Sequence, residues 1–342
     1  MLNKVIKESL IQDAKKLIDK YEKMVILTHV SPDGDALGSS LGLSFFLTEL
    51  GNSVNVVVPN DFPPFLAWMP GAKDIVVASK KPALAAEVIE GAELIFCLDF
   101  NTLPRIAQLQ PLVEQSEAKK ILIDHHLDPD DIFDVTISYP EISSTSELIF
   151  RFICRQGLYH LVTEPCAECI YTGMMTDTGA FTFNSNSPYI YYIISELLKK
   201  GIDKDAIYSK VYNTYTESRV RLQGYLLYEK LKIYKEYGTA LMTLTNSEKN
   251  KFGWKKGDTE GFVNIPLTIE EVIFSAFIRE DEKDMVRISF RSKGDFPTNE
   301  FAAKVYGGGG HLNASGGEFY GKIVDAVKLF EEALPGFMEE LT

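Results

Sequence analysis

Short apolar runs alternate with helical patterns through the first half of the chain. Apolar residues recur at helical spacing in four segments, 1–22, 37–50, 82–90 and 103–117. The β-rich runs lie at 24–30, 53–59, 93–100 and 119–126. Each run is nearly continuous in apolar residues, as in strands that helices cover on both faces. The pattern predicts an α/β fold with a doubly wound, mostly parallel sheet, whose ligands bind beyond the carboxyl ends of the strands.

The pattern changes near residue 236, where helical segments give way to strands. The predicted strands lie at 238–245, 272–280 and 285–292, and a helical pattern follows at 322–334. Strands followed by a helix predict a second, smaller α+β domain. The domain boundaries that we predict are 1–190 for the first domain, 191–235 for a helical linker and 236–342 for the second domain.

The charge of the chain argues against some partners. The 342 residues include 35 Lys and Arg against 48 Asp and Glu, which gives a net charge of −13. We expect no binding of long DNA or RNA, because that affinity comes mostly from Lys and Arg on phosphates. No apolar run approaches the roughly 18 residues of a membrane helix. The N-terminal pattern is that of an amphipathic helix and not of a signal peptide, so we expect a cytoplasmic protein without a membrane partner.

The four cysteines leave one alternative open. Cys166 and Cys169 form a CxxC pair, and Cys154 and His160 are nearby in the sequence. A structural zinc site usually needs a second such pair. The spacing therefore favours small buried thiols in a reducing compartment.

Acidic residues and histidines gather where the predicted strands end. His29, Asp33 and Asp35 follow the first run, in a turn set by Pro32 and Gly34. The later strand ends and turns carry Asp99, Asp124, His125, His126 and Asp177. Taken singly, each is most often a turn, cap or surface residue. Together they are expected to meet, because the carboxyl ends of parallel strands share one edge of the sheet.

Clustered carboxylates and imidazoles need a compensating charge. Like charges repel, burial of an unpaired charge is costly, and divalent cations are the strongest opposite charges available. Oxygen and imidazole ligands without thiolate favour manganese, with magnesium, iron and cobalt as competitors. The candidates outnumber the roughly three or four protein ligands that one ion takes, which favours two ions about 3.5–4 Å apart with a bridging carboxylate.

These motifs resemble the DHH phosphoesterase superfamily, which is named after the triplet at 124–126. The HxxxDxD motif at 29–35, the strand-end Asp99, the triplet and the TDTGAF segment with Asp177 occur in the order of that family. The segment GGGGHLNASG at 307–316 resembles the signature of its C-terminal DHH-associated domain. The length and layout are most similar to the bacterial NrnA-type enzymes, oligoribonucleases that also remove the 3′-phosphate from adenosine 3′,5′-bisphosphate.

The resemblance implies a role for each residue of the first domain. One manganese ion would be held by His29, Asp33 and Asp99. The other ion would be held by Asp35, Asp99, His125 and Asp177. Asp99 would thus bridge the two ions. His126 would face the substrate phosphate and assist catalysis, while Asp124 would orient an imidazole.

The second domain offers groups suited to phosphate. The candidates are Arg287, Ser289, Arg291, Gly308, Gly309, Gly310 and His311. Glycines let backbone N–H groups approach an anion, arginines offer planar forks, and strand alternation places residues 287, 289 and 291 on one face. A flexible glycine turn and ordinary surface arginines stay open as alternatives. The resemblance implies that this domain grips the nucleotide end, and a two-domain cleft is expected to favour short substrates.

The expected function is that of a manganese-dependent phosphoesterase with two ions, for which magnesium or cobalt could substitute. Its substrates would be short oligoribonucleotides, cleaved to mononucleotides, and adenosine 3′,5′-bisphosphate, cleaved to AMP and phosphate. The alternatives are hydrolysis of polyphosphate or pyrophosphate, cleavage of the cyclic-dinucleotide product pApA, and a nucleotide sensor without catalysis. The inorganic pyrophosphatases of the family lack the GGGGH element, and a sensor would not need the whole ligand set. The sequence leaves a homodimer and the cleavage direction open.

Overall fold

A computed structural model describes residues 5–281 and 284–340. The chain divides into two compact units, Met1–Thr214 and Tyr215–Thr342. The boundary falls inside the segment 191–235 that we predicted as a helical linker. Within the described residues, no helix is both long and apolar enough to cross a membrane.

The first unit is built on a six-stranded sheet in which each neighbouring pair of strands is parallel. Its strands are β1 (Lys23–Leu27), β2 (Ser53–Val58), β3 (Val76–Val77), β4 (Leu94–Leu98), β5 (Lys119–Asp124) and β6 (Val135–Ser138). The spatial order is β3-β2-β1-β4-β5-β6, so the chain reverses direction across the sheet between β1 and β4. The predicted doubly wound parallel sheet is thus confirmed. The short strands β3 and β6 were not predicted, because runs of two and four residues carry little pattern.

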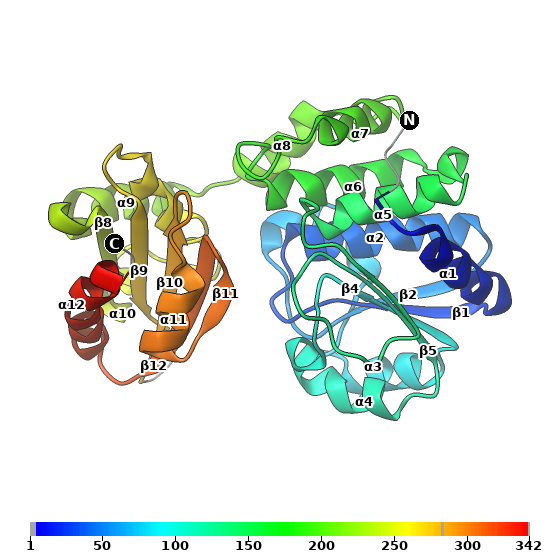
Figure 1. Ribbon diagram of the computed structural model, residues 1–342, viewed down its shortest axis with the longest axis horizontal. Coiled ribbons are helices and arrows are strands. Elements are labelled where there is room, and N and C mark those ends of the chain that lie inside the picture. Colours follow the sequence, from blue (N-terminus) through cyan, green and yellow to red (C-terminus); the bar gives the residue numbers. More distant parts are fainter. Residues whose placement is uncertain (1–4, 282–283, 341–342) are drawn as a thin grey trace. The chain divides into compact units, whose positions relative to one another are not determined.

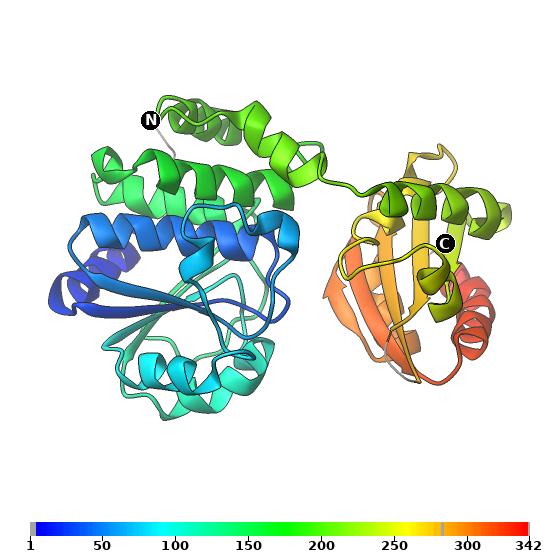
Figure 2. The same ribbon diagram turned by 180° about the vertical axis from the view of Figure 1, so that it is seen from behind.

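Helices cover both faces of this sheet (Figure 1). One face carries α1 (Glu8–Lys20), α2 (Gly34–Glu49), α5 (Thr145–Arg155) and α6 (Glu164–Asp177), and their apolar side chains share one core with alternate strand residues. The other face carries α3 (Pro82–Glu90), the 3₁₀ segment η3 (Leu103–Leu109) and α4 (Gln110–Gln115) over a second core. Helices α7 (Pro188–Leu198) and α8 (Lys204–Tyr212) pack on α6, as the two opposite views show (Figures 1 and 2).

Helices α2 and α6 approach each other closely because glycines line their contact. A Cβ atom on Gly38 would lie 2.6 Å from the carbonyl oxygen of Cys169 and 2.7 Å from the Cα of Gly173. Gly34 and Gly42, one turn away on either side, also face α6. This contact brings the N-terminal end of α2 against the C-terminal end of α6. Those two ends carry acidic residues of the predicted site.

The second unit is a mixed six-stranded sheet in the order β11-β12-β10-β9-β8-β7. Its strands are β7 (Lys232–Tyr234), β8 (Thr239–Leu244), β9 (Phe274–Glu280), β10 (Met285–Ser292), β11 (Gly309–His311) and β12 (Ala314–Tyr320). Only β8 and β9 pair in parallel. Helices α11 (Thr298–Tyr306) and α12 (Ile323–Glu340) share an aromatic core with one face, and α9 (Glu217–Tyr225) packs on the other. The short helix α10 (Asn246–Lys251) follows β8.

Candidate metal centre

The predicted residues of the first unit meet where the strand order reverses. His29 follows β1, and Asp99 follows the neighbouring strand β4. Loops after these two strands lead to opposite faces of the sheet, which leaves a crevice beyond their carboxyl ends. His125 follows β5, the next strand along. The topology alone thus gathers three chain segments at one point.

One group of three possible ligands contains His29, Asp33 and Asp99. The Nε2 atom of His29 lies 3.4 Å from Oδ2 of Asp99 and 4.0 Å from Oδ1 of Asp33. Asp33 is the N-cap of α2, and its Oδ1 accepts hydrogen bonds from the N–H groups of Asp35 and Ala36. The cap therefore fixes this carboxylate at the crevice. The ligand atoms of the group lie within 4.8 Å of one another.

A second group contains Asp35, His125 and Asp177, with its ligand atoms again within 4.8 Å of one another. The Nε2 atom of His125 lies 3.7 Å from Oδ2 of Asp177 and 3.5 Å from Oδ1 of Asp99. Asp177 is the last residue of α6, and Asp35 lies in the first turn of α2. Asp99 presents one oxygen to His29 and the other to His125, so it stands between the two groups.

Backbone carbonyls orient both of these histidines. The Nδ1 atom of His29 lies 2.8 Å from the carbonyl oxygen of Val30, and that of His125 lies 3.2 Å from the carbonyl oxygen of Ile142. A carbonyl oxygen only accepts, so each Nδ1 carries the proton. When the ring is neutral, the lone pair is on Nε2 and points to the carboxylates. This is the usual arrangement of an imidazole that binds a metal ion.

The N-terminus of α5 holds the carboxylate of Asp35. The backbone N–H of Thr145 donates to its Oδ2 at 2.7 Å, and that of Ser146 donates to its Oδ1 at 2.9 Å. The hydroxyl of Thr145 also donates to Oδ1 of Asp99 at 3.0 Å. Thr145 and Ser146 were missed in the sequence. The signal was the run of hydroxyl residues at 143–146, which is typical of a helix start near a carboxylate.

Asp99 occupies an unusual backbone conformation. It is 2% exposed and has φ of +63°, in the left-handed region that non-glycine residues seldom adopt. Such a conformation costs of order 1–3 kcal/mol and persists only where the surroundings impose it. It turns the side chain out of β4 so that both carboxylate oxygens face the crevice.

The two histidines hold protons more tightly than usual. Burial lowers the pKa of His29, but its hydrogen bond to Asp99 and the charges of Asp33 and Asp99 outweigh burial and raise it to about 9. The positive charge of Arg105 opposes that rise. Burial also lowers the pKa of His125, yet the hydrogen bond to Asp99 and nearby carboxylates raise it well above its usual value. At neutral pH the protonated imidazoles therefore supply positive charge that a metal ion would otherwise provide.

The pKa values of the carboxylates are pushed apart. Burial and repulsion by Asp99 raise the pKa of Asp35 to about 7. Burial and repulsion by Asp35 raise the pKa of Asp177 well above its usual range. Burial acts in the same direction on Asp99, but hydrogen bonds from His125 and His29 hold its pKa well below the usual value. Asp99 is thus the carboxylate that stays ionised at the middle of the cluster.

His126 is held by Asp124, the last residue of β5. Its Nδ1 lies 2.7 Å from Oδ1 of Asp124, which is completely buried. The same Nδ1 lies 3.8 Å from Oδ1 of Asp99, and His126 forms a third group of possible ligands with Asp99 and His125. Asp124 therefore orients the imidazole of His126, whereas a backbone carbonyl orients that of His125.

The donor set fits divalent cations. Within the described residues, none of the acids Asp33, Asp35, Asp99 and Asp177 forms an ion pair with a lysine or arginine. Carboxylates that gather without such partners repel one another, and divalent cations relieve this most effectively. Carboxylate oxygens with imidazole nitrogens and no thiolate suit manganese or magnesium better than structural zinc. The four cysteines are free thiols, three of them buried, and none belongs to the groups of possible ligands found among the described residues.

The predicted phosphate-binding residues of the second unit gather around β10. A cavity of about 370 Å³ is lined by Arg287, Ser289, Gly309 and Glu318, among others. Arg287 is half-exposed and pairs with Asp281 at 3.0 Å and with Glu318 at 3.4 Å. An anion that binds Arg287 must therefore compete with two carboxylates.

Arg291 and the glycines are engaged mainly in contacts within the second unit. The guanidinium of Arg291 is largely buried and donates to the carbonyl oxygen of Phe290 at 2.8 Å. A Cβ atom on Gly308 would lie 2.0 Å from the carbonyl oxygen of Gly316, across the β11–β12 hairpin. Gly308 is thus required for close strand packing, while Gly309, Gly310 and His311 form an exposed strand. The glycine run is a strand edge and not a flexible turn.

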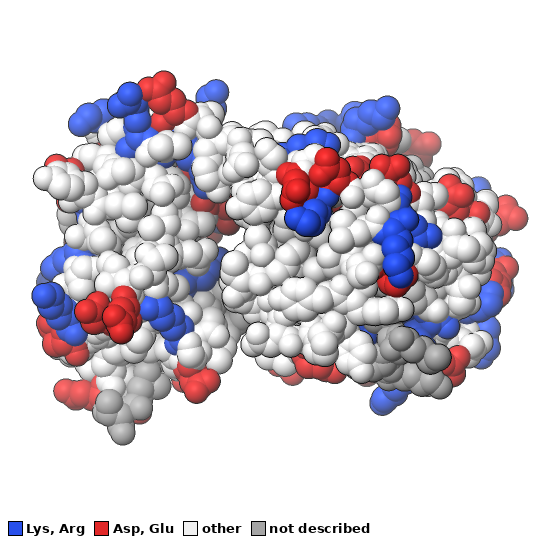
Figure 3. Space-filling model, turned by 90° about the horizontal axis from the view of Figure 1, so that it is seen from above, with Lys and Arg blue, Asp and Glu red and all other residues white. Residues whose placement is uncertain are grey.

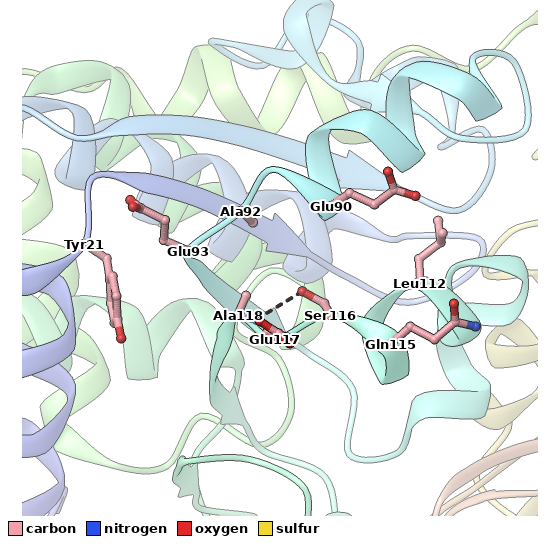
Figure 4. Close-up of a pocket in the computed structure, with 9 residues that line it drawn as sticks. All are labelled: Tyr21, Glu90, Ala92, Glu93, Leu112, Gln115, Ser116, Glu117 and Ala118. Carbon is pink, nitrogen blue, oxygen red and sulfur yellow. Dashed lines mark hydrogen bonds between the residues drawn. The ribbon is translucent and has the colours of Figure 1, made fainter.

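A second cavity lies at the opposite, amino edge of the first sheet. Its volume is about 600 Å³, and Tyr21, Glu93 and Glu117 are among its lining residues (Figure 4). The carboxylate of Glu93 already accepts from the N–H groups of Glu22 and Lys23.

On the face that Figure 3 draws, acidic and basic side chains are mixed, without an unbroken basic band. Neither feature offers chemistry comparable to the carboxylate and histidine cluster.

Comparison with known proteins gives consistent matches. Residues 23–174 match the model of the DHH family, N-terminal domain, and residues 234–339 match that of the DHHA1 domain. A Streptococcus mutans protein named probable bifunctional oligoribonuclease and PAP phosphatase NrnA is 31% identical over 303 residues, which cover 89% of this chain and 91% of that protein.

Two solved structures share the fold. The crystal structure of an exopolyphosphatase-related protein from Bacteroides fragilis is 57% identical, with a TM-score of 0.97 and coverage of 99% of both chains. The crystal structure of the exonuclease RecJ bound to manganese is 14% identical, with a TM-score of 0.53, and covers 98% of this chain and 96% of that chain. At that identity the RecJ likeness shows the fold alone.

Proposed function

The chain belongs to the DHH family and is a metal-dependent phosphoesterase, and from this membership we propose that it hydrolyses short oligoribonucleotides and adenosine 3′,5′-bisphosphate with two manganese ions. The observation that carries the proposal is the position of Asp99 between two groups of ligand atoms. A carboxylate shared in this way is typical of two-metal sites that hydrolyse phosphate esters.

The proposed ligands follow the two groups. His29, Asp33 and Asp99 would hold one ion, and Asp35, His125 and Asp177 would hold the other together with Asp99. When bound, such cations supply a hydroxide nucleophile near neutral pH and offset the charge of the phosphoryl oxygens. Magnesium or cobalt would be the substitutes for manganese, because the donor set suits those ions as well.

His126 would act on the substrate itself. Its Nδ1 lies 2.7 Å from Oδ1 of the buried Asp124, which as a carboxylate can only accept. The Nδ1 proton is therefore fixed there, and Nε2 is the ring atom that would meet a phosphoryl or leaving-group oxygen. A proton on Nε2 would be donated to that oxygen, so His126 would act as a general acid.

The second unit would bind the remaining phosphate of the substrate. Arg287, Ser289 and Gly309 line one cavity, in which an anion would meet a hydroxyl, a strand-edge backbone and, in competition with Asp281 and Glu318, a guanidinium. Gly310 and His311 continue the same exposed strand β11 beside it. Arg291 would contribute mainly by supporting β10, since its guanidinium is bonded to the Phe290 carbonyl.

The substrate class is inferred from the relative's name and the charge. The Streptococcus mutans protein is named an oligoribonuclease and PAP phosphatase. Both substrates carry a phosphate ester, the group that a two-metal centre hydrolyses. The net charge of −13 disfavours a long polyanion outside the site.

One observation favours a second candidate. The Bacteroides fragilis structure, at 57% identity, is described as exopolyphosphatase-related. Polyphosphate would present the same anionic groups to the metal centre. It lacks a nucleoside, however, whereas the name of the Streptococcus mutans protein points to nucleotide substrates.

A substrate panel separates these proposals. Metal-free native protein is supplied with manganese and then with adenosine 3′,5′-bisphosphate, the dinucleotide pApA, pyrophosphate or polyphosphate, and phosphate or nucleotide release is followed. We expect manganese-dependent turnover of the first two substrates at much higher kcat/KM than of the last two. A preference for polyphosphate would favour the second candidate, and no turnover with any substrate would refute both.

A further inference from the structure

Arg105 stands out among the partly buried arginines of the first unit because its guanidinium has no partner. Within the described chain, it forms no hydrogen bond and no ion pair. Arg151 and Arg155, by contrast, are bonded to Glu147 and Glu8 and hold helices in place. An arginine that served only the fold would be expected to resemble these two. The unpaired guanidinium of Arg105 therefore suggests a role other than stabilising the fold.

The backbone around Arg105 is pinned beside the metal centre. Its carbonyl oxygen accepts from the N–H of Val30, next to His29, at 2.8 Å. Leu103, two residues earlier in η3, donates its N–H to Asp130 at 2.8 Å, in the loop after the DHH triplet. Loops from β1 and β5 thus fix this turn at the same sheet edge as the ligands. Its charge lies close enough to His29 to oppose the protonation of that imidazole.

The turn that carries Arg105 also contains a residue with a strained backbone. Ala107 has φ of +46° and ψ of −120°, which interrupts η3 directly after the buried Ile106. A conformation of this kind costs of order 1–3 kcal/mol and is retained where packing imposes it. The kink keeps η3 from continuing as a regular helix. Arg105 consequently lies on a short helical turn that ends at this kink.

The charge balance of the proposed reaction calls for such a group. Asp33, Asp35, Asp99 and Asp177 bring four negative charges, which two divalent cations neutralise. A phosphate ester and a hydroxide nucleophile then add negative charge that the cations alone leave uncompensated. Phosphoryl transfer sites usually place an arginine or lysine at this position in space. Arg105 is a cation whose charge acts on the ligand candidate His29, and within the described residues it pairs with none of the four acids.

We propose that Arg105 binds a non-bridging oxygen of the phosphoryl group that occupies the metal centre. This inference rests on the proposed function, because it assumes that the centre receives a phosphate ester. The planar guanidinium donates two parallel N–H bonds to phosphate, a geometry that lysine lacks. Arg105 is therefore a substrate-binding residue beyond those predicted from the sequence, and it contributes from the catalytic unit itself.

Two variants of Arg105 and one control test the proposal. R105Q removes the charge, R105K keeps a charge but loses the fork, and R221Q removes an exposed guanidinium of α9 that pairs only with Glu217. Each full-length variant is loaded with manganese and titrated with inorganic phosphate by calorimetry. Manganese affinity, the thermal unfolding midpoint and the kcat/KM for pApA are measured on the same preparations.

We expect R105Q to bind phosphate roughly 10- to 100-fold more weakly, as for loss of a charge-assisted bidentate bond. R105Q should still bind manganese and unfold near the native midpoint, because the guanidinium is neither a proposed metal ligand nor bonded to another described group. R105K should recover part of the loss, and R221Q should match the native protein. Native-like phosphate affinity in R105Q, or loss of manganese binding in step with it, would overturn the proposal.

The outcomes also separate this inference from the proposed function. If the native protein turns over no nucleotide but binds phosphate in an Arg105-dependent way, the substrate assignment fails and the role of Arg105 stands. If the native protein cleaves pApA and R105Q does so equally well with equal phosphate affinity, the role of Arg105 fails alone. Native, manganese-loaded protein that binds no phosphate contradicts the inference directly.

Discussion

Oδ1 of Asp124 lies 2.7 Å from Nδ1 of His126 at the end of β5, and Asp124 is fully buried. An ionised carboxylate only accepts, so the pair fixes the proton of His126 on Nδ1. Within one triplet, His125 and His126 are thus oriented by different groups. The His125 ring is turned by a backbone carbonyl toward the carboxylates, and the His126 ring is turned by a side chain.

The Asp124–His126 pair predicts a specific loss in D124N. An asparagine can donate from its amide and so favours the other tautomer of the imidazole, as in catalytic triads where this change costs about 10⁴ in kcat. We expect kcat for pApA to fall by about 10²–10⁴, with manganese affinity near native. Asp134→Asn, which changes a carboxylate near β6 away from the cluster, is the matched control. Equal activities of D124N and the native protein would show that the pair has no catalytic role.

Substitution of Asp99 should weaken metal binding even where the variant folds normally. Its φ of +63° is tolerated by asparagine but strained for alanine. We therefore expect D99N to fold with near-native stability and D99A to lose about 1 kcal/mol or more of unfolding free energy. Both variants should lose most of their turnover and bind less than two manganese ions per chain. Turnover by D99N above about a tenth of native would contradict the bridging position.

Manganese affinity should rise with pH. One ion would need an unprotonated Nε2 on His29 and the other an ionised Asp35, and the pKa values of these two groups in the metal-free protein are about 9 and about 7. Below pH 7 both protons must leave when the metal binds, and between pH 7 and 9 mainly that of His29 must leave. Calorimetry in buffers of different ionisation enthalpy should show fewer protons released per ion at pH 8.5 than at pH 6.5. An affinity and proton release that do not change over this range would contradict the linkage.

A larger residue in the glycine contact between α2 and α6 should weaken both the fold and metal binding. In G38A the new Cβ meets backbone atoms of Cys169 and Gly173, which cannot rotate away. Overpacking of this kind costs typically 1–3 kcal/mol, and it would also move Asp35 away from Asp177. We expect lower unfolding free energy together with weaker manganese binding. Gly224, which has open space around it in α9, gives the control G224A, for which a gain of up to about 1 kcal/mol is expected.

The sequence predicts the parallel sheet well, because its signal is local. The limits of β2, β5 and α3 agree closely with the predicted runs, since buried strands are continuous in apolar residues. Strand β6 has only four residues and alternates in burial, so it resembles a loop in the sequence. Strands β11 and β12 of the second unit are also hard to predict from the sequence. Their glycines are required by close strand contact and carry no β propensity.

The acidic and histidine cluster follows from topology, whereas its supporting groups do not. Residues at strand ends converge whenever the strands are parallel and adjacent, so the gathering of His29 and Asp99 needs no side-chain detail. The N–H groups of Thr145 and Ser146 reach Asp35 only because α5 begins at that point, 110 residues further along the chain. Arg105 was missed because an arginine without a partner looks like any other arginine in a sequence.

The central claim is that Asp99 is shared by two cations, and anomalous diffraction at the manganese edge tests it most directly. Crystals of the native protein grown with manganese should show two anomalous peaks about 3.5–4 Å apart. One peak should contact His29 Nε2 and Asp33, the other His125 Nε2 and Asp177, and both should contact Asp99. A single peak, or two peaks of which one lies beyond reach of Asp99, would contradict the account.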